Sequence, residues 1–97
     1  MAKAYWIVFY RSISDPAALS EYAKRGGAVI QSGGGRFIVR GMPAKTVEAG
    51  INQRTVVIEF DSLDQALATY NHPEYQAAYR LLEGKVDRDV RFVEGVG

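Results

Sequence analysis

The sequence contains no cysteine and only one histidine among its 97 residues. Without cysteine, the chain can form no disulfide, thiolate metal site or cysteine nucleophile, and such a composition is usual in reducing compartments. A single histidine also rules out a pair of histidines at metal-binding spacing. We therefore expect neither a metal nor an organic cofactor.

The chain also lacks a strong excess of charge and a long apolar run. The net charge is +1, and the basic residues are scattered along the sequence, so the basic surface that a nucleic acid requires is not predicted. No stretch is apolar enough to span a bilayer, and no leader pattern follows Met1. These features predict a soluble cytoplasmic protein without a nucleic-acid or membrane partner.

Hydrophobic residues, in contrast, make up 47% of the chain, which predicts one folded domain over residues 1–97. Four segments rich in β-branched and aromatic residues predict strands at 4–11, 36–41, 55–60 and 88–94. The first is apolar at both alternating sets of positions, so we expect it to be central and covered on both faces. In the second, alternation places Phe37 and Val39 on one face and Arg36, Ile38 and Arg40 on the other.

Two helices are predicted between these strands. Asp15 and Pro16 are typical of a helix start, and the helix is expected to run to Gln31 with a kink or break at Gly26-Gly27. Ser62 followed by Gln65 resembles a capping box that starts the second helix. Proline disfavours helical geometry in the residue before it, so the second helix should break at His72-Pro73 and restart.

The order strand, helix, strand, strand, helix, strand predicts a ferredoxin-like α+β fold, βαββαβ, with both helices on one face of a four-stranded antiparallel sheet. The first and third strands are then central. Helices can cover only one face, so the face carrying Trp6, Val8 and Val57, or its opposite, should be an exposed apolar patch. We expect a homodimer that packs sheet against sheet.

Several segments also resemble a known family. They are GGRFIVRG, VVIEF, YNHPEYQAAYRLLEG and a closing FVEG, in this order. Together they resemble the domain-of-unknown-function family DUF1330, within the dimeric α/β-barrel superfamily, over nearly the whole chain. The resemblance implies the fold and a dimer whose sheets form a barrel. Members of that superfamily include cofactor-free monooxygenases, isomerases and dehalogenating or haem-degrading enzymes, so it implies no catalytic residues.

Two residues are candidates for catalysis. His72 is the only histidine, and histidine carries protons near neutral pH, but the plainer interpretation is an exposed turn residue beside Pro73. Glu59 is a carboxylate on an otherwise apolar central strand. It is either an acid or base that acts on a ligand held by Arg36 or Arg40, or a partner in a cross-strand ion pair.

Aromatic residues suggest where a ligand could bind. Tyr70 and Tyr75 lie on or beside the helix after Glu59, and with Trp6 they either line a cleft for a flat molecule or pack in the core. We hypothesise a dimer that binds or converts a small hydrophobic or aromatic metabolite, with monooxygenase-like or isomerase-like chemistry. The alternative is a non-catalytic binding or accessory module.

Overall fold

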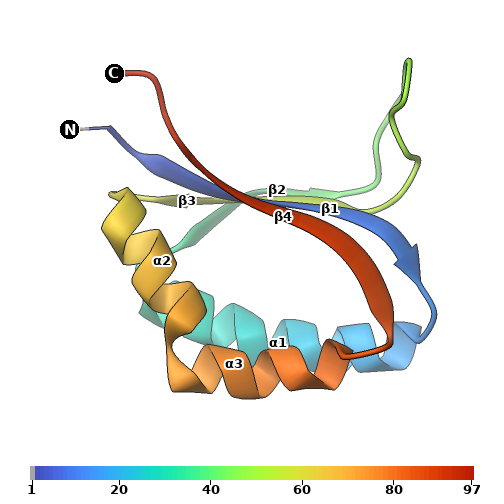
Figure 1. Ribbon diagram of the computed structural model, residues 1–97, viewed down its shortest axis with the longest axis horizontal. Coiled ribbons are helices and arrows are strands. Elements are labelled where there is room, and N and C mark those ends of the chain that lie inside the picture. The colour runs from blue at the N-terminus through green and yellow to red at the C-terminus, as the bar shows by residue number, and fades with distance from the viewer. Residues whose placement is uncertain (1) are drawn as a thin grey trace.

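The computed structural model describes residues 2–97 as one α+β unit with helices on one face of a sheet (Figure 1). The elements in chain order are β1 (Ala4–Ile13), α1 (Pro16–Ser32), β2 (Arg36–Gly41), β3 (Thr55–Phe60), α2 (Leu63–Asn71), α3 (Pro73–Tyr79), a 3-10 turn η1 (Arg80–Leu82) and β4 (Val86–Glu94). The antiparallel sheet has the order β2-β3-β1-β4. This is the predicted ferredoxin-like arrangement, with β1 and β3 central.

Helix α1 begins as the sequence predicts but is not interrupted. The Asp15 carboxylate accepts a hydrogen bond from Ala18 N at 3.1 Å, and Pro16 occupies the first helical position. The expected break at Gly26-Gly27 is wrong, because α1 continues to Ser32. Gly34 follows with φ of 96°, a conformation that favours glycine, and turns the chain into β2.

The junction between α2 and α3 confirms the predicted break. His72 has extended backbone geometry, with φ −63° and ψ 135°, and its Nδ1 accepts from Glu74 N at 3.1 Å to cap α3. At the other end of α2, Ser62 Oγ accepts from Gln65 N at 3.2 Å. The Gln65 amide does not return to Ser62 but donates to Gly33 O at 2.8 Å, which ties the start of α2 to the end of α1.

The sheet presents one face to the helices, here called the inner face, and leaves the other, the open face, uncovered (Figure 1). Trp6, which is fully buried on the inner face, lies opposite Ile58 and Phe92, with aromatic ring centroids 4.9 Å away at Tyr75 and 5.2 Å away at Phe92. The prediction that Trp6, Val8 and Val57 share a face is therefore wrong. Val57 lies opposite Ile7 on the open face.

Strand β2 contains a bulge that the alternation of its sequence did not reveal. Phe37 lies opposite Ile58, but Val39 lies opposite Val57, so Ile38 is an extra residue in the register. A bulge shifts which side chains face each way. The predicted faces are corrected accordingly: Phe37 and Arg40 belong to the inner face, whereas Arg36 and Val39 belong to the open face.

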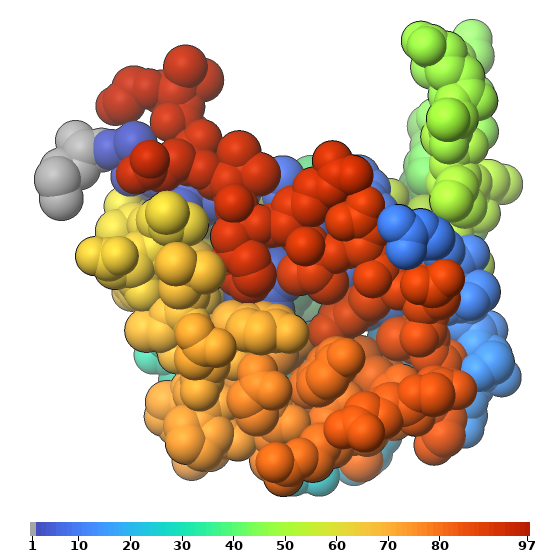
Figure 2. All heavy atoms as spheres, viewed as in Figure 1, coloured from blue at the N-terminus to red at the C-terminus, as the bar shows by residue number. Residues whose placement is uncertain are grey.

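Residues 42–54, here called the arm, connect β2 to β3 and rise on the side of the sheet away from the helices (Figures 1 and 2). The arm contains a turn closed by Gly50 N donating to Val47 O at 2.9 Å. Met42, Val47 and Ile51 are each more than half exposed along the arm. None of the helices in residues 2–97 has the length and apolar character needed to cross a bilayer.

Candidate functional site

A cavity of about 40 Å³ lies between the inner face of the sheet and α1. Every strand contributes to its lining, which consists of Trp6, Val8, Tyr10, Tyr22, Ala23, Gly27, Ile30, Phe37, Arg40, Arg54, Val56, Ile58 and Arg88. Alternation of side chains along β1 and β3 directs the apolar residues toward α1. The apolar part of the cavity lining is therefore formed by the inward-facing residues of these strands.

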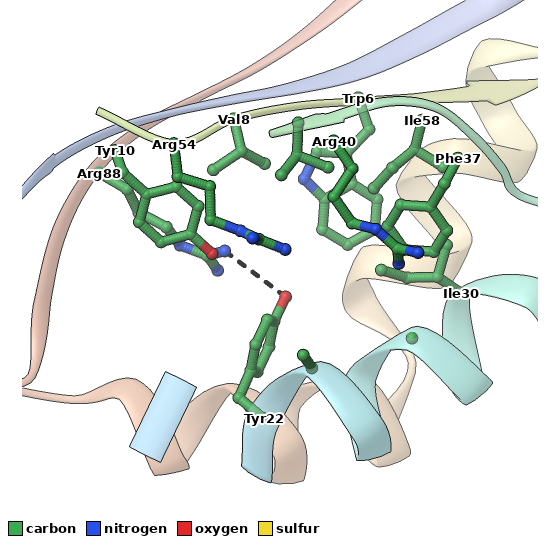
Figure 3. A pocket seen from close by; sticks show the side chains of 13 residues that line it. Trp6, Val8, Tyr10, Tyr22, Ile30, Phe37, Arg40, Arg54, Ile58 and Arg88 are labelled. Carbon is green, nitrogen blue, oxygen red and sulfur yellow. Dashed lines mark hydrogen bonds between the residues drawn. The ribbon is translucent and has the colours of Figure 1, made fainter. Parts of the chain in front are cut away.

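The two ends of the cavity differ in character (Figure 3). Trp6, Ile58, Phe37 and Ile30 gather at one end, where Arg40 lies over Phe37, and Tyr10, Tyr22, Arg54 and Arg88 gather at the other. A molecule with an apolar body and an anionic group matches this division.

Arg88 is the most unusual residue of the site. It lies on β4 with its guanidinium between tyrosines: Nη2 donates to Tyr75 Oη at 3.0 Å and Nη1 to Tyr22 Oη at 3.5 Å. Its central carbon lies 5.3 Å from the Tyr22 ring centroid, 5.5 Å from that of Tyr79 and 5.8 Å from that of Tyr10. Within residues 2–97 it forms no ion pair with a carboxylate.

The charge of Arg88 stays uncompensated at neutral pH. Burial raises the pKa of the Tyr75 hydroxyl far above its ordinary value, and burial also raises the pKa of Tyr10, so both phenols remain neutral. Burial opposes the charged form of Arg88, but the hydrogen bond that Arg88 donates to the Tyr75 hydroxyl favours that form, and the pKa of Arg88 is raised overall, so the guanidinium stays charged. Even a partly buried cation without an anion is energetically unfavourable, and cation–π contacts offset only part of that cost.

The polar atoms around the cavity include more donors than acceptors. Trp6 Nε1 and Arg88 Nε are both buried and have no hydrogen-bond partner within residues 2–97. The Tyr22 and Tyr75 hydroxyls lie 2.6 Å apart, and both accept a hydrogen bond from Arg88. One of the two hydroxyls donates its hydrogen to the oxygen of the other, so the hydrogen of the second hydroxyl remains free to donate to a ligand. Buried donors normally have partners, so this arrangement matches an acceptor-rich ligand.

The cavity opens between α1 and strand β2 at the sheet edge. Among its lining residues, Ala23 and Arg40 are exposed and Gly27 and Arg54 are partly exposed, whereas Tyr22 and Ile30 of the same helix are buried. The Arg40 guanidinium lies over the Phe37 ring with its central carbon 4.8 Å from the ring centroid. Cationic side chains thus stand at the mouth as well as at the polar end.

The model for the family described as "Domain of unknown function (DUF1330)" matches residues 3–96. The chain belongs to the DUF1330 family. A comparison with curated proteins gives no match.

Solved structures share the fold of this DUF1330 chain. One is the RPA0582 protein of unknown function from Rhodopseudomonas palustris, with TM-score 0.77 and 14% identity over 99% of this chain and 84% of that one. Another is a dimeric ferredoxin-like protein of unknown function from Bacteroides fragilis, with TM-score 0.63 and 18% identity over 95% of both chains. A third, SnoaB from Streptomyces nogalater, is described as a cofactor-independent oxygenase and has TM-score 0.69 and 12% identity over 100% of this chain and 96% of that one.

The first candidate from the sequence, Glu59, lies on the open face of the DUF1330 sheet and not in the cavity. Its carboxylate accepts from Arg36 Nε at 3.2 Å and from Tyr5 Oη at 3.2 Å. Arg36 also donates to Asp61 at 3.0 Å. The arrangement is the cross-strand ion pair that was one of the two interpretations of Glu59, and it separates Glu59 and Arg36 from the cavity by the thickness of the sheet.

The other four candidates are also dispersed. His72 caps α3 beside a surface hollow of about 120 Å³ that it shares with Thr69 and Glu74. Tyr70 packs on Trp6, with ring centroids 5.4 Å apart. Of the predicted residues, only Arg40 lines the cavity. Tyr75 does not line it, but its hydroxyl accepts a hydrogen bond from Arg88, which does.

Sequence reasoning missed Arg88, Tyr22 and Arg54 as site residues. A signal for Arg88 was present, because it alternates with Val90 and Phe92, the two apolar positions of β4 that face inward. Basic side chains are rare at the inward-facing positions of a strand, so a basic residue there indicates a candidate site. No group of histidine and carboxylate side chains within residues 2–97 is arranged to hold a metal ion.

Proposed function

We propose that this protein binds a small organic carboxylate in the cavity between the sheet and α1. The observation that carries the proposal is the partly buried Arg88 guanidinium, which lacks a carboxylate partner within residues 2–97 and lies at the polar end of the cavity. The planar guanidinium matches a carboxylate in shape and charge. The unpartnered Trp6 Nε1 supports a second acceptor on the ligand.

The cavity also limits the size and polarity of the ligand. A volume of 40 Å³ encloses only a few heavy atoms, so the remainder of a larger ligand has to pass through the mouth beside Arg40 and Arg54. Trp6, Val56 and Ile58 favour an apolar body, and the Trp6 and Phe37 rings favour a planar one. Short-chain and aromatic monocarboxylates therefore fit best.

The single tryptophan provides a direct test. We expect saturable shifts of the Trp6 indole N–H signal in ¹H–¹⁵N spectra on titration with benzoate or acetate, because this donor lines the cavity. Benzylamine, a cation of similar shape to benzoate, should cause no such shift. Equal shifts with benzoate and benzylamine, or none with either carboxylate, would contradict the proposal.

Conversion of the ligand is a second candidate function, favoured by the surplus of donors. Donors aimed at one end of a cavity stabilise negative charge that develops during a reaction. The lining contains no histidine or carboxylate that could take a proton, so a substrate would have to be acidic itself. The fold shared with SnoaB motivates measuring oxygen uptake with bound acids. Recovery of the bound acid unchanged would support a binding module instead.

We further propose that the protein is a homodimer whose open faces pack together into a barrel. Phe9, Val39 and Val93 are exposed on the open face, and the apolar side chains of the arm stand on the same side. A hollow of about 200 Å³ lies between the arm and the open face. A two-fold axis lets an arm on each copy enter the hollow of the other. Light scattering at micromolar concentration should give twice the chain mass.

A further inference from the structure

The mouth of the cavity contains a glycine that local structure does not require. Gly26 and Gly27 both lie inside α1, where each glycine costs roughly 1 kcal/mol relative to alanine. Neither has the positive φ that would favour glycine. Their presence in an unbroken helix therefore needs another reason.

The reason for Gly26 is packing. A Cβ at this position would lie 3.0 Å from Cε1 of Tyr22, and the Tyr22 hydroxyl is part of the Arg88 cluster. Alanine at position 26 would push on that ring. At position 27 the geometry is different, because a Cβ would have no heavy atom within 4 Å.

We propose that Gly27 sets the size of the acid that the cavity admits, and that it is kept small for the ligand and not for the fold. Gly27 lines the cavity one helical turn after Ala23, and both lie at the mouth, between the buried Tyr22 and Ile30. The same cavity contains Trp6, which is fully buried and has an unpartnered indole N–H on the cavity side (Figure 3). A Cβ at position 27 would occupy space that the body of the ligand uses.

This inference rests on the proposed carboxylate binding and predicts which acids bind. Acetate fits within the enclosed part near the donors and does not reach the mouth. Benzoate is too large for 40 Å³ and has to extend toward Gly27. Narrowing the mouth should therefore discriminate against benzoate and leave acetate binding unchanged.

The test compares Gly27→Ala and Gly27→Leu with the wild type, by titration of the Trp6 N–H signal and by thermal unfolding. We expect Gly27→Ala to raise Tm by about 4 °C or more, from the helix propensity of alanine. Benzoate affinity should fall about tenfold or more, the scale at which one methylene matters in a tight site, while acetate affinity stays within about twofold. Gly27→Leu should abolish benzoate binding.

Ser20→Ala is the matched control, because Ser20 is exposed on the same helix and away from the cavity. It should also raise Tm but leave both affinities unchanged, which separates narrowing of the mouth from stabilisation of the helix. Gly26→Ala should lower Tm through its contact with Tyr22.

Three results would overturn the inference: unchanged benzoate affinity in Gly27→Ala, an equal loss for acetate and benzoate, or a lower Tm. Failure of the proposed function itself is recognised separately, since the wild-type protein would then bind neither acid, and the inference about Gly27 would fall with it.

Discussion

The two faces of the sheet use arginine in opposite ways. On the open face, Arg36 pairs with Glu59 at 3.2 Å and with Asp61 at 3.0 Å. Arg91 on the same face pairs with Asp89 at 2.8 Å. On the inner face, Arg88 is partly buried among tyrosines and has no carboxylate partner within residues 2–97.

The difference separates arginines whose charge is balanced within the fold from an arginine whose charge is not. Exposed ion pairs contribute about 0–1 kcal/mol each, and charges there are already balanced, so nothing further has to bind. The inner face leaves a cation unbalanced where replacement by an apolar side chain is often neutral or stabilising. A residue that the fold does not need, at the end of a cavity, points to a ligand.

The largest expected effect comes from replacing the arginine of each face in turn. Arg88→Met should weaken carboxylate binding at least about thirtyfold, because it removes the charged partner of the ligand. The free energy of unfolding should stay within about 1 kcal/mol of the wild type or rise, since Tyr22 and Tyr75 remain bonded to each other at 2.6 Å. Titration of the Trp6 N–H signal and urea unfolding measure the two quantities.

Arg36→Met is the control on the open face. It should leave carboxylate affinity unchanged and lower stability only slightly, because the ion pairs of Arg36 are exposed. A loss of stability of about 3 kcal/mol or more in Arg88→Met would instead identify Arg88 as a structural residue of the tyrosine cluster.

A second prediction concerns what covers the open face. Ile7 lies at its centre, opposite Val57 and Arg91. Ile7→Asp should raise the dimer dissociation constant at least about a hundredfold, since a carboxylate would be buried at the interface. Sedimentation should then show monomers with unchanged circular dichroism and carboxylate binding.

Leu67→Asp places the same charge on an exposed apolar position of α2. This variant should remain dimeric. If both variants stay dimeric, the interface does not lie on the open face.

A third prediction compares one tyrosine from each face. Tyr75→Phe should lower the free energy of unfolding by about 1–2 kcal/mol, because it removes the partner of the buried Tyr22 hydroxyl and of Arg88 Nη2. Tyr5→Phe removes only a partly buried bond to Glu59 and should cost less than about 1 kcal/mol. Urea unfolding of the two variants measures both costs, and equal costs would contradict the distinction between the faces.

Much of the fold could be predicted from local chemistry. Asp15-Pro16 and His72-Pro73 mark helix boundaries through bonds that involve only neighbouring residues. The order of the elements predicted correctly that β1 and β3 are central, but the alternation did not show that Trp6 and Val57 lie on opposite faces. The bulge at Ile38 could not be predicted, because it depends on the pairing with β3 and not on β2 alone. It reversed the expected face of Arg40.

The candidate site was harder to predict because it depends on partners distant in sequence. Glu59 was predicted as a site residue because it is a charge on an apolar strand. On the open face, however, its carboxylate accepts hydrogen bonds from Arg36 and Tyr5. Arg88 could be recognised only once Tyr22 and Tyr75 were known to surround it without a carboxylate. The site is marked by the absence of a carboxylate beside Arg88 within residues 2–97, and one sequence does not show which side chains lie beside each other in the fold.

The smallest expected effect is the contribution of the open face to the dependence of stability on pH. The hydrogen bond from Arg36 holds the pKa of Asp61 below its ordinary value of 3.8, and that from Arg91 does the same for Asp89. A carboxyl group whose pKa is lower in the folded state stabilises the fold above its unfolded pKa, and this contribution is lost as the pH falls through the folded pKa. Asp61→Asn should therefore lower the urea midpoint slightly at pH 7 and not at pH values below the folded pKa of Asp61.

On the inner face, Arg88 and the neutral Tyr10 and Tyr75 do not titrate near neutral pH, so benzoate affinity should be constant between about pH 6 and pH 9. A change in affinity within that range would show that another titrating group faces the ligand, and would remove the contrast between the two faces.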